Sequence, residues 1–374
     1  MRIIFACAGT GGHVNPAIAM AKIVLKNEPN SKFLFIGTEN GIENNLVNNA
    51  GFDIRHISTG KIIRSFTFRN LKAVVDTYRG IGQARKIIME FKPDLVIGTG
   101  GYICGPVMLA AKKLNIPYIL HESNAFPGVS VKLLAKNAKC VMIGFKEAKE
   151  RLKRKDNVLY TGTPAKFDVQ SFDSLDKEAC KRKLGLNSIN KKIVLVTCGS
   201  QGAKSINETV LKMVDENPSE KYFVVLVTGK NSYDEMLTNL KNIEKKHGIS
   251  LNEYIRIEKF IFNMDEMYKA SDMCVTRAGA MTVTELAITA KPAILIPLPS
   301  AAENHQLYNA KVLENAGAGK IIEQKNLNEN ILNSTILEMI SNDNIAQMST
   351  NARKLVINGV DEKIYKCIKE SIKK

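Results

Sequence analysis

The chain has 374 residues, a length typical of two domains. Apolar residues make up 45% of it and charged residues 24%, a globular composition that excludes whole-chain disorder, collagen and coiled coil. The 53 lysine and arginine residues outnumber the 37 acidic ones, which gives a formal net charge of +16. An excess of this size indicates an anionic partner, such as nucleic acid, anionic lipid or a phosphorylated substrate.

The cysteines and the lengths of the apolar runs indicate the compartment of the protein and whether it contains a membrane-spanning helix. The seven cysteines are scattered and form no C-x-x-C pair, a pattern typical of free thiols in a reducing cytoplasm. The apolar runs are far shorter than the roughly 20 residues that a bilayer-spanning helix needs, so no such helix is expected. The apolar N-terminus runs directly into a glycine loop, and we therefore expect it to be the first strand.

The first half of the chain alternates short apolar runs with helical stretches. Apolar residues recur with helical spacing over 15–26, which predicts a helix there. Strands are expected at residues 3–8, 32–37, 93–98, 117–120, 139–144 and 158–161. This alternation is typical of a parallel sheet covered by helices on both faces.

The same alternation starts again after a charged segment at 146–157 and a join near 162–170. A helix is expected at 205–215, strands at 191–197, 222–228, 254–260, 273–276 and 292–297, and two helices in the tail from about 344. The fold class is therefore α/β, with two doubly wound, Rossmann-like domains. Ligands of such sheets bind at the carboxyl ends of the strands, and two such domains favour a site in the cleft between them.

The first glycine loop, Gly9 to His13, follows the first strand and opens a helix. Glycines let the backbone approach an anion, and the helix N-terminus supplies N–H groups and a positive dipole end. Val14 interrupts the dinucleotide fingerprint and no Walker lysine follows, so the loop predicts a different anion site. An isolated histidine is usually a surface or capping residue, but the place of His13 in this loop favours a neutral imidazole that can accept a proton.

Two more polar loops follow strands of the first half. The Gly100-Gly101-Tyr102 loop is explained equally well as a turn or as a site. The segment from His121 to Asn124 places four polar residues after an apolar strand, which is more than a turn needs. We therefore expect the second segment to contribute to a site.

In the second half, the loops at 199–203, 277–285 and 297–306 follow strands. The carboxylate of Glu285 can accept hydrogen bonds from two vicinal sugar hydroxyls, although a first-turn acid stabilised by the helix dipole is an alternative. The sequence contains no D-x-D, H-E-x-x-H or EF-hand motif, so no metal cage is expected.

A basic and apolar stretch occupies residues 55–92. It carries nine basic residues against two acidic ones, and Ile62, Ile63, Phe66 and Phe68 lie among them. This composition suits docking on an anionic membrane surface. A solvated charged helix over a core is the main alternative. Nucleic acid is the other, and no RNA-binding or DNA-binding motif supports it.

Taken together, the loops carry a resemblance through their residues and their order. They read G-T-G-G-H-V-x-P-A from residue 9, G-G-Y from 100, H-E-x-N from 121, G-S-Q-G-A from 199, R-x-G-A-x-T-V-x-E from 277 and N-H-Q-x-x-N-A from 304. In this order the chain resembles the MurG family of bacterial N-acetylglucosaminyltransferases over about residues 1–320. The resemblance implies a GT-B fold, whose two domains face each other across a cleft.

The resemblance also implies a function for each domain. Residues 1–164 would form an acceptor and membrane-side domain, residues 165–344 a UDP-GlcNAc-binding domain, and helices at about 345–374 would pack back on the first. The reaction would be inverting transfer of N-acetylglucosamine (GlcNAc) from UDP-GlcNAc to the C4 hydroxyl of the muramoyl sugar of lipid I. The product would be lipid II for peptidoglycan synthesis, made at the cytoplasmic face of the cell membrane by a peripheral enzyme. The resemblance implies no cofactor. Stimulation by a divalent cation is compatible with it.

Individual site residues follow from the resemblance. His13 is the leading candidate base and Glu122 the second, while Gly101 and Tyr102 would contact the acceptor. The sugar-nucleotide contacts would be Thr10, Gly11, Gly12, Asn124, Lys166, Ser200, Ile261, Ala280, Met281, Thr282, Val283, Thr284, Glu285 and Gln306. Two positions depart from the family: Ala8 replaces a glycine, and Lys166 replaces an arginine and so loses a two-pronged phosphate grip.

Three other functions remain open from the sequence. One is a UDP-sugar transferase that uses another lipid acceptor, such as diacylglycerol. The second is a UDP-GlcNAc epimerase, which shares the fold, and the third is a sugar-nucleotide-binding regulator without turnover. The basic stretch argues against a soluble epimerase. The intact His13, Asn124 and Glu285 argue against a protein that only binds.

Overall fold

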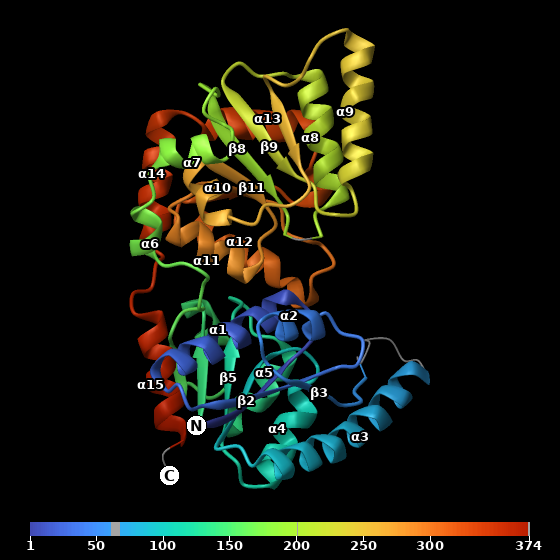
Figure 1. Cartoon of the computed structure of the whole chain (residues 1–374), viewed down its shortest axis with the longest axis vertical. Helices are drawn as coiled ribbons and strands as arrows, with labels where there is room; N and C mark the ends of the chain where they lie inside the picture. Colours follow the sequence, from blue (N-terminus) through green and yellow to red (C-terminus); the bar gives the residue numbers. More distant parts are fainter. Residues whose placement is uncertain (61–67, 200, 373–374) are drawn as a thin grey trace. The chain divides into compact units, whose positions relative to one another are not determined.

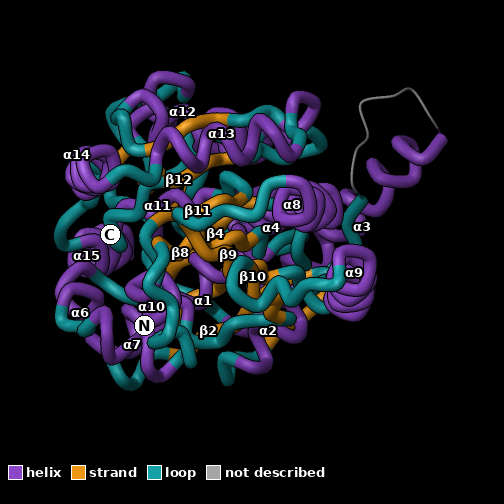
Figure 2. The backbone as a smooth tube through the Cα atoms, turned by 90° about the horizontal axis from the view of Figure 1, so that it is seen from above, coloured by secondary structure: helices purple, strands orange, loops and turns teal. Residues whose placement is uncertain are grey.

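The computed structural model describes residues 1–60, 68–199 and 201–372, with side chains for all of these except 68–74. The chain divides into two compact units (Figure 1). The N-terminal unit comprises Met1–Lys166 with Ile357–Lys374, and the C-terminal unit comprises Phe167–Val356. Each unit is built on its own parallel sheet, and helices lie around the strands of both sheets (Figure 2).

The N-terminal unit has a seven-stranded parallel sheet in the order β3-β2-β1-β4-β5-β6-β7. The strands are β1 (Arg2–Cys7), β2 (Lys32–Gly37), β3 (Ile54–His56), β4 (Leu95–Gly100), β5 (Tyr118–Glu122), β6 (Cys140–Ile143) and β7 (Val158–Tyr160). The chain runs outward from β1 to β3 and then returns to β4, beside β1. The direction of the sheet therefore switches between β1 and β4, and such a point opens a crevice at the carboxyl ends of the strands.

Helices cover both faces of this sheet. On one face, α1 (Gly11–Asn27), α2 (Glu43–Asn49) and α15 (Val360–Ile372) bury apolar side chains against Phe5 and Phe35. On the other face lie α3 (Phe68–Phe91), α4 (Cys104–Lys113) and α5 (Val129–Leu134). The last helix is also held by polar contacts, because the Tyr365 hydroxyl donates to Glu28 Oε1 at 2.7 Å.

The C-terminal unit has a six-stranded parallel sheet in the order β10-β9-β8-β11-β12-β13. The strands are β8 (Lys192–Thr197), β9 (Tyr222–Val227), β10 (Ile255–Glu258), β11 (Met273–Thr276), β12 (Ala293–Leu295) and β13 (Gly319–Ile321). The helices are α6 (Val169–Asp173), α7 (Lys177–Lys183), α8 (Lys204–Glu216), α9 (Tyr233–His247), α10 (Met264–Ala270), α11 (Ala280–Ile288), α12 (His305–Asn315), α13 (Glu329–Met339) and α14 (Asn342–Arg353). The switch point here lies between β8 and β11.

The α/β class and the two doubly wound sheets predicted from sequence are confirmed, with local differences. The three-residue strands β3 and β13 were not predicted, because runs this short carry little periodicity. Helix α1 begins at Gly11 rather than at residue 15. Strand β5 continues to Glu122 rather than ending at residue 120, so His121 and Glu122 are buried sheet residues, not part of a loop.

Candidate active site

The predicted loops of the N-terminal unit lie on either side of its switch point. The glycine loop connects β1 to α1, and the Gly100-Gly101-Tyr102 segment follows β4, the neighbouring strand. Thr10 is the N-cap of α1 in extended conformation, so the helix opens with Gly11 and Gly12. The first N–H groups of a helix have no partner within it, and a glycine-rich helix start after a strand is the arrangement typical of an anion site.

The two loops touch so closely that side chains cannot fit between them. A Cβ atom on residue 100 would lie 2.5 Å from His13 Cδ2, and one on residue 101 would lie 2.4 Å from the carbonyl oxygen of Ala8. Both glycines also have positive φ values, 118° and 87°, which other residues rarely adopt. The loop after β4 therefore supports the loop after β1 directly.

The contacts of His13 define its tautomer. Its Nδ1 lies 3.0 Å from the carbonyl oxygen of Ala8, which can only accept, so Nδ1 carries the hydrogen. In the neutral ring the lone pair is then on Nε2, which packs over Gly100. The backbone is fixed as well, because the Thr99 hydroxyl donates to the His13 carbonyl at 2.7 Å. The ring is half-buried, and its Nδ1 side is held by the backbone.

A buried carboxylate from α2 anchors the glycine loop. Glu43 is fully buried, and its Oε1 accepts from the backbone N–H of Thr38 at 2.9 Å and from the Thr38 hydroxyl at 2.6 Å. Its Oε2 accepts from the Gly9 N–H at 3.3 Å. Burial alone would raise the pKa of Glu43, but these hydrogen bonds outweigh burial and hold the pKa below its usual value. An ionised side chain thus ties the end of β2 to the start of the glycine loop.

Glu122 orders the loop that follows β5. Its Oε1 accepts from the Asn124 N–H at 2.9 Å and from the Asn124 side-chain amide at 3.0 Å. Its Oε2 accepts from the Gly128 N–H at 2.7 Å. Burial raises the pKa of Glu122, although the bonds from Asn124 and Gly128 and the charge of His13 oppose the increase. Both carboxylate oxygens therefore hold residues 124–128 in place.

The neighbouring His121 has a structural role in the same unit. It is fully buried, with Nε2 3.3 Å from the carbonyl oxygen of Gly162 and Nδ1 3.3 Å from the Ser123 hydroxyl. Burial lowers its pKa to about 4, so the ring is neutral at physiological pH. Nε2 donates to the carbonyl, and Nδ1 accepts from Ser123. His121 thereby joins the end of β5 to the segment that leads out of the N-terminal unit.

In the C-terminal unit, the predicted 277–285 motif follows β11 at the switch point. Gly279 is the N-cap of α11, so the helix begins with residues 280–282 and directs their N–H groups toward the carboxyl end of the sheet. Arg277 Nη1 donates to the carbonyl of Ile296 at 3.0 Å, and Nη2 donates to Gln324 Oε1 at 2.6 Å. The Asn309 side chain donates to the Ala278 carbonyl at 3.1 Å. The loop is thus fastened to the segment after β12, to α12 and to the segment after β13.

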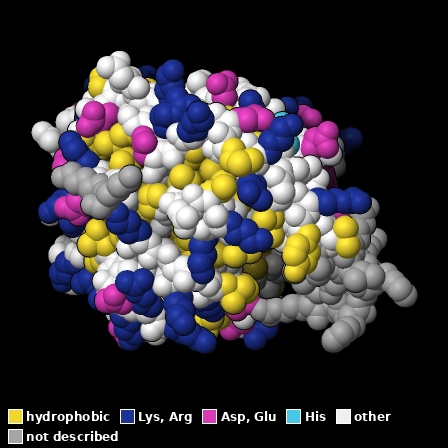
Figure 3. Space-filling view, turned by 90° about the horizontal axis from the view of Figure 1, so that it is seen from below, with side chains coloured by type: hydrophobic (Ala, Val, Ile, Leu, Met, Phe, Trp, Pro, Cys, Tyr) yellow, Lys and Arg dark blue, Asp and Glu magenta, His cyan; other side chains and the backbone are white. Residues whose placement is uncertain are grey.

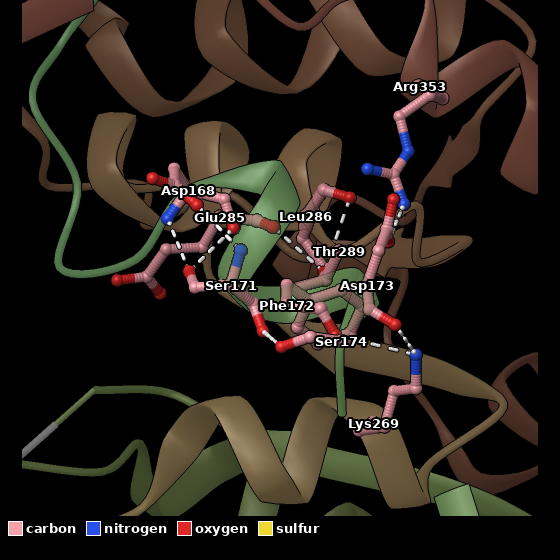
Figure 4. A network of polar contacts seen from close by, with 10 residues as sticks. All are labelled: Asp168, Ser171, Phe172, Asp173, Ser174, Lys269, Glu285, Leu286, Thr289 and Arg353. Atoms are coloured by element: carbon pink, nitrogen blue, oxygen red, sulfur yellow. Dashed lines mark hydrogen bonds and ion pairs between the residues drawn. The ribbon is translucent and has the colours of Figure 1, made fainter. Parts of the chain in front are cut away.

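Glu285 lies in the second turn of α11 and is half-buried. Its Oε2 accepts from the hydroxyl of Tyr268 at 3.2 Å. Figure 4 draws Glu285 in one network of polar contacts with α6, Lys269 and Arg353. In that network Arg353 Nη2 donates to Asp173 Oδ1 at 2.8 Å, and the Thr289 hydroxyl donates to the Glu285 carbonyl at 2.8 Å.

The other predicted donor contacts lie at separate places in the chain. Ile261 follows β10, and Gln306 lies in the first turn of α12, where its Oε1 accepts from the Leu298 N–H at 2.9 Å. Lys166 is exposed at the end of the N-terminal unit, and Ser200 lies outside the described residues. Sequence reasoning missed the roles of Glu43 and Tyr268, because a lone acid and a helical aromatic residue look like ordinary surface and core positions.

Within the part of the chain that the structure describes, no group of three or more His, Cys, Asp or Glu side chains could hold a metal ion.

Comparison with known proteins identifies the family. Residues 3–143 match the glycosyltransferase family 28 N-terminal domain, and residues 193–364 match the C-terminal domain of the same family. A protein of Acetivibrio thermocellus is 40% identical over 100% of this chain and 99% of its own length. It is named UDP-N-acetylglucosamine--N-acetylmuramyl-(pentapeptide) pyrophosphoryl-undecaprenol N-acetylglucosamine transferase. The chain belongs to the MurG family.

Other MurG-family members and solved structures agree with this assignment. A Bacillus cytotoxicus protein with the same name is 38% identical over the full length of both chains. The crystal structure of Acinetobacter baumannii MurG superposes with a TM-score of 0.78 at 26% identity, covering 99% of each chain. An S. aureus MnaA–UDP structure, at 18% identity and a TM-score of 0.67, shares the fold. The MurG-family resemblance and the GT-B fold predicted from sequence are confirmed.

Proposed function

We propose that the chain transfers GlcNAc from UDP-GlcNAc to the C4 hydroxyl of the muramoyl sugar of lipid I, giving lipid II with inversion at the transferred carbon. The observation that carries the proposal is full-length identity of 40% to a transferase of that name. The structure supports it with two switch-point sites, one in each unit, whose loops carry the family's motifs.

The C-terminal unit is proposed to bind the donor. The N–H groups of Ala280, Met281 and Thr282 open α11, and the helix dipole favours a diphosphate at this position. Glu285 then accepts hydrogen bonds from the ribose hydroxyls. The remaining proposed contacts are Ser200, Ile261, Val283, Thr284 and Gln306, together with Lys166, which retains a positive charge for phosphate.

The N-terminal unit is proposed to bind the acceptor through the glycine loop and Gly101 and Tyr102, and Thr10 and Asn124 are proposed sugar-nucleotide contacts. The opening of α1 offers its first N–H groups to the acceptor diphosphate. His13 is the proposed base. Its Nε2 takes the proton of the C4 hydroxyl as the oxygen bonds to C1 of GlcNAc, and the bond from C1 to the diphosphate oxygen breaks.

Glu122 fits a positioning role better than that of the base. Both its oxygens are occupied by N–H donors of residues 124 and 128, so neither can take a proton from a substrate hydroxyl without losing a hydrogen bond that orders this loop. The consequence is an ordered loop over residues 124–128. His13 thus becomes the single proposed base among the two candidates from the sequence.

Docking of the N-terminal unit on an anionic membrane is proposed for residues on α3, α4 and α5. Tyr78 on α3 is 73% exposed, and Leu133 on α5 is 74% exposed. Leu109 is exposed on α4, the helix that packs against both α3 and α5. Exposed basic residues accompany them: Arg79, Lys112, Lys113 and Lys136. Figure 3 shows a face on which Lys and Arg side chains surround patches of hydrophobic ones.

Part of the basic stretch predicted from sequence lies outside the described residues. This concerns Ile62, Ile63, Arg64 and Phe66, and the side chains of Phe68, Arg69 and Lys72. Within the described residues, no helix has the length and hydropathy needed to cross a membrane. The proposal of a peripheral enzyme at the cytoplasmic face therefore rests on the exposed side chains of α3–α5, where apolar groups enter the headgroup region and Lys and Arg contact anionic lipid.

Incubation with UDP-GlcNAc and a short-chain lipid I analogue tests the proposal. We expect a disaccharide lipid and free UDP in equal amounts. A product formed with diacylglycerol, or epimerised UDP-sugar without any acceptor, would replace the proposed function with one of the alternatives. Binding of UDP-GlcNAc without product under all these conditions would refute catalysis.

A further inference from the structure

A buried phenol on α10 donates to the carboxylate that the proposed donor site needs. Tyr268 is 1% exposed, and its hydroxyl lies 3.2 Å from Glu285 Oε2. Burial, reinforced by the charge of Glu285, raises the pKa of Tyr268 well above its usual value. The phenol therefore keeps its proton, and Tyr268 is the donor of this hydrogen bond.

The Tyr268 side chain is restrained by burial, by aromatic packing and by the position of its helix, so its hydroxyl has a fixed direction. Phe167 meets it edge-on at 6.4 Å between ring centroids, and Phe167 packs in turn on Phe172 at 6.2 Å. The backbone carbonyl of Tyr268 accepts from the Ser271 hydroxyl at 3.1 Å. Helix α10 also packs against α7 and β8. A donor this constrained limits the orientations that its acceptor can adopt.

Orientation matters for Glu285 because a ribose diol presents two hydroxyls at a fixed separation. A carboxylate accepts best from donors near its own plane, along its lone-pair directions. Without an anchor, the side chain would sample several rotamers, and ordering it at binding would reduce affinity. Tyr268 anchors Oε2 before the ligand arrives.

We propose that Tyr268 is a positioning residue for nucleotide binding, which acts by orienting the Glu285 carboxylate toward the ribose hydroxyls. The inference rests on the proposed function, since it takes Glu285 as the ribose ligand. It extends that function by naming a residue that does not touch the substrate. A purely structural phenol would affect folding alone, and the two roles differ in what they predict for binding.

The test measures dissociation constants of UDP and 2′,3′-dideoxy-UDP by calorimetry for the parent and for Tyr268→Phe. This change removes one oxygen and leaves the ring packing intact. We expect UDP to bind about three- to tenfold more weakly, because an anchoring hydrogen bond to a charged group is lost. Binding of the dideoxy nucleotide should not change, because it has no ribose hydroxyls for Glu285 to hold.

Tyr222→Phe is the matched control. Tyr222 on β9 is 2% exposed, and its hydroxyl donates to Asn333 Oδ1 at 2.6 Å, so the variant loses the same atom and a similar bond. Its melting temperature should fall without a change in UDP affinity. Glu285→Ala completes the design: it should weaken UDP binding about 10- to 100-fold, and adding Tyr268→Phe to it should have no further effect.

The outcomes distinguish failure of the positioning role of Tyr268 from failure of the proposed function. If Tyr268→Phe binds UDP as the parent does, or loses affinity equally for both nucleotides, the positioning role is wrong while the donor site stands. If the parent fails to bind UDP, or Glu285→Ala binds it normally, the proposed ribose contact of Glu285 is wrong. The positioning role of Tyr268 is then wrong as well, because it depends on that contact.

Discussion

The change Glu43→Gln should weaken binding of the acceptor, because Glu43 holds the glycine loop from outside it. In this variant the side-chain amide oxygen can serve the two donors of Thr38, and this leaves the amide nitrogen facing the Gly9 N–H. A hydrogen bond to a charged acceptor is worth about 1.5–3 kcal/mol, and a length of 3.3 Å places this one at the lower end. Since about 1.4 kcal/mol is a factor of ten, the acceptor KM should rise about tenfold.

Steady-state kinetics with a short-chain lipid I analogue measure this effect. We expect kcat and the KM for UDP-GlcNAc to stay within about threefold of the parent, because His13 at the end of this loop keeps its own contacts with the Ala8 carbonyl and the Thr99 hydroxyl. Glu28→Gln is the matched control. Glu28 lies in the same unit, where its carboxylate accepts from Tyr365 after the end of α1. An unchanged acceptor KM in Glu43→Gln, or an equal rise in Glu28→Gln, would refute the reasoning.

Three further predictions concern the base, the membrane and pH. His13→Ala should lower kcat roughly 100-fold or more with little change in the KM for UDP-GlcNAc, and a raised acceptor KM at normal kcat would make His13 a phosphate ligand instead. The double change Tyr78→Glu with Leu133→Glu should reduce co-sedimentation with anionic vesicles while turnover of a soluble acceptor persists; unchanged sedimentation would place docking elsewhere. His121 is neutral when folded, with a pKa of about 4, and takes up a proton on unfolding below pH about 6.5. The free energy of unfolding should therefore decrease by about 3 kcal/mol as the pH falls from about 6.5 to about 4. In His121→Gln this free energy should depend less steeply on pH, and an equal slope in the two proteins would contradict a neutral, buried His121.

The sequence was sufficient for the architecture because buried parallel strands are nearly continuous apolar runs. The run at 273–276 coincides with β11, and the run at 32–37 coincides with β2. Strand ends were less certain where polar residues continue a strand. His121 and Glu122 belong to β5, yet their polar side chains led us to predict a loop there. Only the pairing of β5 with β6 shows that they are sheet residues.

The sequence also located the loops of the candidate site, because glycines and polar residues mark the ends of strands. It could not find the residues that hold those loops. Glu43 is 34 positions from Gly9, and Tyr268 is 17 positions from Glu285. Each contact depends on how helices pack on the sheet, and a single sequence contains no periodic signal for one side chain reaching another element.

In both units, residues outside the motifs hold the loops that carry them. Glu43 holds Gly9 in the N-terminal unit, and Tyr268 holds Glu285 in the C-terminal unit. Ordering one residue of a loop costs about 1–2 kcal/mol of conformational entropy, and contacts of this kind place that cost in folding rather than in ligand binding. Removing such a contact should therefore raise a KM and leave kcat nearly unchanged, whereas removing a group that acts on the reacting atoms should lower kcat. The ratio of these two effects distinguishes an anchoring residue such as Glu43 from a base such as His13.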